Sequence, residues 1–139
     1  MAGDAAVILM IDDNAGEAFL FQEALEDYGM PHNFHHVEDA ESARAFLERT
    51  GKQADAPRPD VILLDMKLPG TGGLEVLRRI KADSDLADIP VFMVSTLAPG
   101  SDVEEARNLG ATGFITKPDN FDGYAEVIDQ IRTALENTG

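Results

Sequence analysis

The 139-residue chain contains no cysteine, which excludes disulfide bridges, thiolate metal sites and cysteine nucleophiles. Basic residues are scarce, because 11 Lys and Arg stand against 26 Asp and Glu and leave a formal net charge of −15. That charge has the wrong sign for a surface that binds nucleic acid or an anionic membrane, so we expect neither as a partner. No apolar run approaches the roughly 18 residues of a membrane-spanning helix, and no basic region precedes the apolar stretch at residues 5–11. We therefore expect a cytoplasmic protein.

The length and composition indicate one domain with one core. The chain falls within the range of about 100 to 200 residues that is usual for a domain, and 44% apolar residues against 27% charged ones suffice to build a core. The polar, proline-bearing stretch at residues 50–59 leads directly into an apolar run, which favours a surface loop over a domain boundary. We predict a single domain over residues 1–139, with its core at about 6–135.

Five short apolar runs alternate with stretches of helical periodicity. The runs are predicted strands, at residues 6–11, 33–37, 61–64, 91–94 and 113–116. Predicted helix starts are Asn14 with Glu17, Asp39, and Ser101 with Glu104. Strands that alternate with helices indicate an α/β fold with a parallel sheet, right-handed crossovers and helices on both faces.

Polar residues follow four of the predicted strands: Asp12 and Asp13, Asp65, Ser95 and Thr96, and Lys117. The carboxyl ends of parallel strands meet at one rim, where ligands bind. Two unit charges about 4 Å apart repel by about 4 kcal/mol at an effective dielectric near 20, so three carboxylates at this rim require a cation. A divalent ion held by carboxylates, a carbonyl and waters is the pattern of Mg²⁺. Lys117 and Ser95 can bind phosphoryl oxygens, and Asp65 can act as a nucleophile that forms an aspartyl phosphate.

With these residues the chain resembles the response regulator receiver domain, the CheY-like family of two-component signalling. Asp65 has Pro69 four residues further on, and Lys117 precedes Pro118; separations of 52, 30 and 22 residues link Asp13, Asp65, Ser95 and Lys117, close to those of the family. The resemblance covers residues 6–135. It implies a flavodoxin-like, doubly wound (βα)5 sandwich whose five-stranded parallel sheet has the order 2-1-3-4-5. Within the family, the chain looks like the stand-alone regulators that serve phytochrome-type kinases.

Carried over residue by residue, the resemblance makes Asp65 the phosphoacceptor. It makes Asp13 a direct Mg²⁺ ligand and Asp12 a ligand through water, with the main-chain carbonyl of Lys67 completing the protein ligands and Mn²⁺ as the alternative ion. Ser95 would hydrogen-bond the phosphoryl group and Lys117 would pair with it. The Lys117–Pro118 bond is cis in this family, so we expect a cis bond here.

The resemblance also implies a switch made of Ser95 and Phe114. The loop after the fourth strand would move toward the phosphoryl group and Phe114 would rotate inward. The face formed by the fourth helix, fifth strand and fifth helix commonly binds partners or dimerises in the family, so a homodimer through it is an expectation. The phosphoryl donor would be a histidine kinase or a histidine phosphotransfer protein, and the downstream protein target is not indicated. Such a domain is a phosphoacceptor that promotes its own Mg²⁺-dependent phosphorylation and dephosphorylation, and is not otherwise an enzyme.

Other readings remain open at this point. The chain could be the receiver fragment of a longer regulator or of a hybrid kinase. A haloacid-dehalogenase-type phosphatase needs a second Asp at the position of Lys67. A flavodoxin-like electron carrier needs a phosphate loop after the first strand, where Asp12 and Asp13 would repel the phosphate. Three histidines, at positions 32, 35 and 36, lack the spacing of a tetrahedral metal site. Phe19 and Leu20 extend the apolar surface of the first helix, and we expect them in the core, or in a partner contact if they prove exposed.

Overall fold

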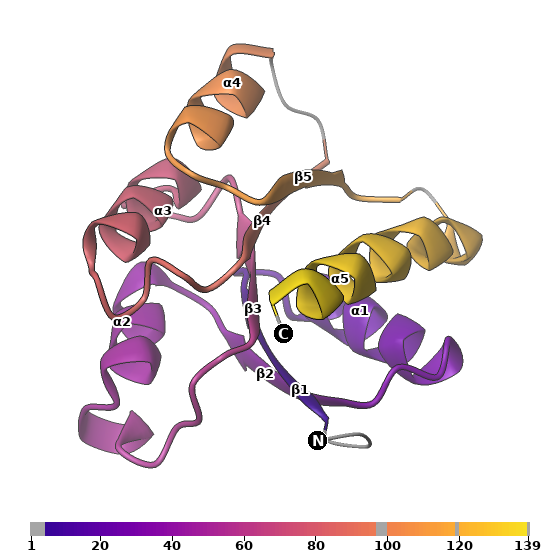
Figure 1. Ribbon diagram of the computed structural model, residues 1–139, viewed down its shortest axis with the longest axis horizontal. Helices are drawn as coiled ribbons and strands as arrows, with labels where there is room; N and C mark the ends of the chain where they lie inside the picture. Colours follow the sequence, from indigo (N-terminus) through magenta and orange to yellow (C-terminus); the bar gives the residue numbers. More distant parts are fainter. Residues whose placement is uncertain (1–4, 97–99, 119, 139) are drawn as a thin grey trace.

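The computed structural model describes residues 5–96, 100–118 and 120–138, and it forms one central β-sheet with helices on both sides (Figure 1). The strands are β1 (Ala6–Ile11), β2 (His32–Val37), β3 (Val61–Asp65), β4 (Val91–Ser95) and β5 (Gly113–Thr116). Each strand runs parallel to its neighbours, in the order β2-β1-β3-β4-β5. The predicted fold class and strand order are confirmed.

Five α-helices cover the two faces of the sheet: α1 (Ala15–Asp27), α2 (Ala40–Glu48), α3 (Gly73–Ala82), α4 (Gly100–Asn108) and α5 (Tyr124–Thr138). Two short 3₁₀ turns, η1 (Gly51–Gln53) and η2 (Phe121–Gly123), precede β3 and α5. Figure 1 shows α1 and α5 on one face and α2 and α3 on the other. No helix in the described ranges is long and apolar enough to cross a bilayer. The sequence before the apolar stretch at residues 5–11, in which we found no basic region, consists of residues 1–4, and these lie outside the described ranges.

Alternation along β1 divides the core into two layers. Ile8 and Met10 pack with the helices α1 and α5, whereas Leu9 and Ile11 pack with α2, α3 and α4. Successive side chains of a strand point to opposite faces, so a continuous apolar run is what a strand covered on both sides requires. All residues of β3 and β4 are buried, which fixes the two strands that carry Asp65 and Ser95.

Side chains cap the first two helices as predicted. The Asn14 side chain accepts a hydrogen bond from the Glu17 amide at 3.1 Å, and that of Asp39 accepts one from the Ser42 amide at 2.7 Å. The predicted start at Ser101 is wrong, because α4 already includes Gly100. A helix cap precedes the first helical residue, so Ser101 does not cap α4.

Phe19 and Leu20 are exposed, at 59% and 44%, so the prediction that they belong to the core is wrong. The helix α1 contacts the sheet through a stripe that includes Ala18, Phe21 and Leu25. Such a stripe covers little more than a quarter of the helix circumference, and Phe19 and Leu20 lie beyond it. The apolar pattern therefore extended further round the helix than the sheet can cover.

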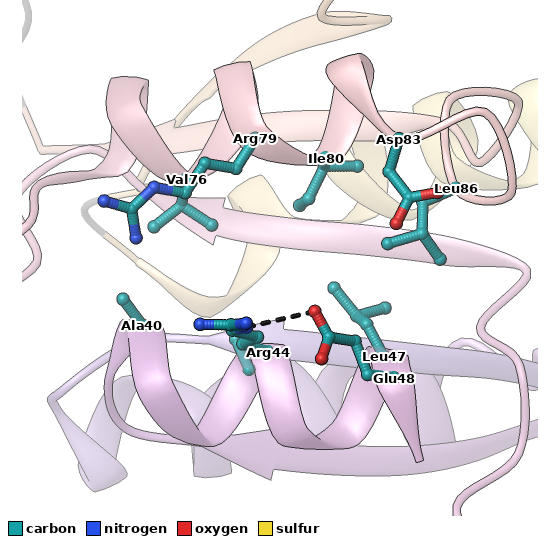
Figure 2. A pocket seen from close by; sticks show the side chains of 10 residues that line it. Ala40, Arg44, Leu47, Glu48, Val76, Arg79, Ile80, Asp83 and Leu86 are labelled. Carbon is teal, nitrogen blue, oxygen red and sulfur yellow. Dashed lines mark hydrogen bonds and ion pairs between the residues drawn. The ribbon is translucent and has the colours of Figure 1, made fainter. Parts of the chain in front are cut away.

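A groove of about 370 Å³ lies between α2 and α3 (Figure 2). Its apolar lining includes Leu47 and Ile80. On the α2 side of the groove, Arg44 forms an ion pair with Glu48 at 3.0 Å. None of the residues that line it is one of the polar residues at the strand ends. The groove is therefore separate from the candidate site.

Gly73 begins α3 and packs against the end of β3. A Cβ atom here would lie 2.2 Å from the Asp65 carbonyl oxygen and 2.8 Å from the Met66 Cα, both parts of the backbone. We expect Gly73→Ala to lower the free energy of unfolding by about 1–3 kcal/mol, because overpacking forces the backbone to shift. Gly100→Ala is the matched control, because Gly100 also begins a helix. Apart from its chain neighbours and its own helix, no atom of the described residues lies within 4 Å of its Cβ position. Urea unfolding compares the two, and an equal loss in both variants would contradict the steric explanation.

Candidate functional site

The sheet register brings the polar strand ends together. Ile11 pairs with Leu64 across β1 and β3, so Asp12 and Asp65 are the next residues on neighbouring strands. On the other side of β3, Ser95 pairs with Thr116, which directly precedes Lys117. A pocket of about 410 Å³ opens at these ends and is lined by Asp13, Asn14, Ala15, Glu17, Asp65, Lys67, Ser95, Thr96 and Lys117.

Three carboxylates at this rim form a cluster suited to a divalent cation. Asp12, Asp13 and Asp65 each offer an oxygen within 4.8 Å of the others. Asp12 and Asp65 are buried, while Asp13 is exposed. The buried Asp12 Oδ2 has no hydrogen-bond partner, which is unusual for a buried polar atom. Hard carboxylate oxygens, one of them buried without a hydrogen bond, fit an ion such as Mg²⁺ or Mn²⁺.

Backbone and side-chain hydrogen bonds hold Asp12 from three sides. Its Oδ1 accepts from the Asn14 amide at 2.8 Å, and its own amide donates to the Val37 carbonyl at 3.0 Å. His36 Nε2 donates to the Asp12 carbonyl at 2.6 Å. Within the described ranges, the one cluster of side chains that could hold a metal ion consists of Asp12, Asp13 and Asp65, so His36 is not part of it. His36 thus supports the backbone of the site. Sequence reasoning missed this role, although its position at the end of a strand next to β1 was a usable signal.

Lys117 extends into the carboxylate cluster. Its Nζ donates to Glu17 Oε2 and lies 3.6 Å from Asp12 Oδ2 and 3.7 Å from Asp65 Oδ1. Its amide donates to the Ser95 carbonyl at 2.7 Å, which ties the residue to the end of β4. Sequence reasoning assigned Glu17 only to the helix start. Its place in the first turn after Asp12 and Asp13 was the signal that could have brought it into the site.

Of the remaining predicted residues, Ser95 and Lys67 line the same pocket, and Phe114 lies beside α4. Ser95 is buried at the end of β4, and the Lys67 amide donates to Asp65 Oδ1 at 3.3 Å. Phe114 is partly buried, and it lines a hollow of about 280 Å³ together with residues of α4. The loop expected to move toward the phosphoryl group includes residues 97–99, which lie outside the described ranges.

The Lys117–Pro118 bond does not have the expected cis geometry. Within the described ranges the structure contains no cis peptide bond, so the prediction is wrong for this structure. A trans bond before proline is favoured by about 0.5–1 kcal/mol unless the surroundings select the other isomer.

Burial and charge shift three pKa values at the site. Burial raises the pKa of Asp12 to about 7, and the neighbouring carboxylates of Glu17 and Asp65 add to this despite opposition from the Asn14 amide and Lys117. Burial also disfavours the charged form of Lys117, but the Glu17 hydrogen bond and the neighbouring carboxylates outweigh it and raise the Lys117 pKa. For Glu17, burial is outweighed by the hydrogen bond from Lys117 and by the proximity of Asp12, and its pKa is lowered.

Known proteins are similar to this chain in both sequence and fold. The family model of the response regulator receiver domain matches residues 8–129. The response regulator Rcp1 of Synechocystis sp. is 34% identical over 127 residues, which are 91% of this chain and 86% of Rcp1.

Two solved structures extend the likeness to three dimensions. The Mn²⁺-bound form of Rcp1 matches with a TM-score of 0.82 and 34% identity, covering 92% of each chain. The phosphorylated cyanobacterial phytochrome response regulator RcpA matches with a TM-score of 0.85 and 36% identity, covering 97% of this chain and 96% of RcpA. The first of these binds a divalent metal and the second carries a phosphoryl group, as their names state.

The raised pKa of Asp12 predicts a pH-dependent stability in the absence of divalent cations. The folded state holds the Asp12 proton more tightly than the unfolded state, since the pKa rises from 3.8 to about 7. This tighter proton binding stabilises the folded state fully below about pH 4, and the stabilisation is lost as the pH rises through 7. At about 1.4 kcal/mol per pKa unit, we expect a loss on the order of 2–4 kcal/mol in unfolding free energy between pH 4 and pH 8. The lowered pKa of Glu17 acts at the acid end of this window, where it adds stability as the pH rises past 4.5, and the raised pKa of Lys117 acts above the window.

Urea unfolding in a chelator, at pH values from 4 to 8, measures this loss. Asp12→Asn should abolish most of the decline. Asp129→Asn, a change at a residue exposed on α5, should retain it and serves as the matched control. A decline that persists in Asp12→Asn would assign it to another group.

Proposed function

The chain belongs to the response regulator receiver domain family of two-component signalling, and we propose that Asp65 is its phosphoacceptor. The proposed donor is the phosphohistidine of a histidine kinase or of a histidine phosphotransfer protein. The observation that carries the proposal is the meeting of Asp65 with Asp12, Asp13 and Lys117 at the carboxyl ends of parallel strands. That is the part of such a sheet where ligands bind.

In the proposed reaction, an Asp65 carboxylate oxygen attacks the phosphorus atom of the donor. A bond forms between that oxygen and phosphorus, and the bond from phosphorus to the donor's histidine nitrogen breaks, with its electron pair remaining on the nitrogen. Phosphoryl transfer depends chiefly on positioning and on neutralising charge. Lys117 supplies one positive charge at 3.7 Å from Asp65, and the buried Ser95 at the end of β4 supplies a hydroxyl donor for the phosphoryl oxygens.

The carboxylates of Asp12, Asp13 and Asp65 and the main-chain carbonyl of Lys67 are the proposed ligands of a divalent cation. We propose Mg²⁺, with Mn²⁺ as the alternative. When bound, such an ion neutralises charge on the transferring phosphoryl group. In this proposal Asp13 binds the ion directly and Asp12 binds it through a water molecule. The same residues support phosphorylation by small donors and the later hydrolysis of the aspartyl phosphate.

The proposed output is a change in partner binding. Phosphorylation adds charge and acceptor oxygens within reach of Ser95, and Phe114 would then move inward toward the core beneath it. The partly buried position of Phe114 beside a hollow at α4 supports this role. The responding surface would be the face made of α4, β5 and α5, which would bind a protein target or a second copy of this chain. The proposed unit is a single receiver domain over residues 1–139.

Asp65→Asn should abolish phosphorylation by acetyl phosphate with Mg²⁺, because an amide is neither the required nucleophile nor an anionic ligand. Intact-mass spectrometry counts phosphoryl groups on the wild type, on this variant and on Asp129→Asn as the control. We expect one group on the wild type and on the control, and none on Asp65→Asn. A phosphoryl group that persists on Asp65→Asn would move the acceptor to another residue.

The two neighbouring acids should differ in their effect on the metal. If Asp13 binds Mg²⁺ directly and Asp12 acts through water, Asp13→Asn should raise the dissociation constant more, by about tenfold or above, than Asp12→Asn does. A magnesium titration followed by NMR of the site residues measures both values. A larger effect of Asp12→Asn would exchange the two roles.

A further inference from the structure

Glu17 adds a fourth carboxylate to the site, in addition to the three acids expected from the sequence. It lies in the first turn of α1 and lines the same pocket as Asp65 and Lys117. Its Oε2 accepts a hydrogen bond from Lys117 Nζ, while the oxygens of Asp12 and Asp65 lie 3.6 and 3.7 Å from that nitrogen. Glu17 is therefore the nearest partner of Lys117 in the unphosphorylated protein.

The cap of α1 does not account for the direction of the Glu17 side chain. In a capping box, an acid at this position turns back to accept from the amide of the capping residue. Here the Asn14 amide donates instead to Asp12 Oδ1 at 2.8 Å, and Asn14 caps the helix through its own side chain. The Glu17 carboxylate extends into the site and pairs with Lys117.

The pair is shielded enough for its charges to matter. The Lys117 side chain is 12% exposed and that of Glu17 is 28% exposed. Charges at partly buried positions are screened by salt less than surface charges are. An ammonium already paired with Glu17 has to change partner before it can neutralise a phosphoryl group on Asp65.

We propose that Glu17 is a positioning residue that holds Lys117 in the resting state and competes with the phosphoryl group on Asp65 for its ammonium. This inference rests on the proposed function of Asp65. Phosphorylation adds negative charge beside Lys117 and draws the ammonium away from Glu17. The Glu17 carboxylate then loses its partner, so the pair favours the unphosphorylated state. Glu17 thus sets how much donor is needed to phosphorylate the domain.

Glu17→Gln tests the proposal, because it removes the charge and retains the size of the side chain. With acetyl phosphate as donor at fixed Mg²⁺, we expect the half-saturating donor concentration to fall by about three- to tenfold, as expected from removing one nearby charge. Glu23→Gln is the matched control, since Glu23 lies on the same helix and is exposed. It loses the same charge without touching the site, and it should leave the half-saturating concentration within about twofold of the wild type.

The effect should depend on Lys117. In a Lys117→Met background, Glu17→Gln should change the half-saturating concentration no more than Glu23→Gln does, because there is no ammonium to release. A gain that persists in this background would mean that Glu17 acts by direct repulsion and would overturn the positioning role.

A second measurement needs neither metal nor phosphoryl donor. In chelator, acetylation of Lys117 by acetic anhydride, followed by peptide mass spectrometry, reports how firmly the ammonium is held. We expect Glu17→Gln to raise the acetylation rate of Lys117 by about threefold or more relative to Glu23→Gln, because the amine is then no longer held by the Glu17 carboxylate. Equal rates in the two variants would overturn the inference.

The measurements separate failure of this inference from failure of the proposed function. A wild type that acetyl phosphate does not modify at Asp65 would contradict the proposed function, while the acetylation rates still test the pair. A wild type that is modified, with Glu17→Gln and Glu23→Gln giving equal half-saturating concentrations, would overturn only the role of Glu17.

Discussion

The ammonium of Lys117 lies among carboxylates that come from three separate segments of the chain. Asp12 directly follows β1, Asp65 ends β3 and Glu17 belongs to the first turn of α1. All three approach the Lys117 Nζ. Without this positive charge, two buried acids would face each other at the ends of adjacent strands. Removing one partner of a buried charge cluster leaves an uncompensated charge and is strongly destabilising. The arrangement of the whole rim thus depends on where Lys117 is held.

The sheet provides the rigidity that such a cluster needs. The strands β3 and β4 are buried throughout, so Asp65 and Ser95 project from a fixed backbone. Gly73 allows α3 to approach the Asp65 carbonyl more closely than any side chain would permit. Close-packed surroundings of this kind resist small displacements. A charge added at Asp65 is therefore expected to move side chains and loops at the rim, while the strands stay in place.

The helix α1 connects the chemistry of the rim with the outer surface. Its first turn supplies Glu17 to the pocket, and its inner stripe packs on the sheet. Its outer side exposes Phe19 and Leu20, and near its end Tyr28 stacks on Phe121 with ring centroids 6.3 Å apart. A change in the partner of Lys117 would thus act on a helix that also presents apolar side chains to solvent. The link between the rim and the outer surface depends on the position of Glu17 in the first turn of α1.

The sequence by itself determined the five strands, their alternation with helices, and the acids and lysine at their carboxyl ends. These features depend on local periodicity and on the rule that parallel strands end at one edge. Other features required the tertiary structure. The pairing of Lys117 with Glu17, the support of Asp12 by His36 and the exposure of Phe19 depend on how distant segments face each other. Local patterns carry no information about which of several nearby acids a lysine will reach, because that choice depends on distances set by the packing of α1 against the sheet.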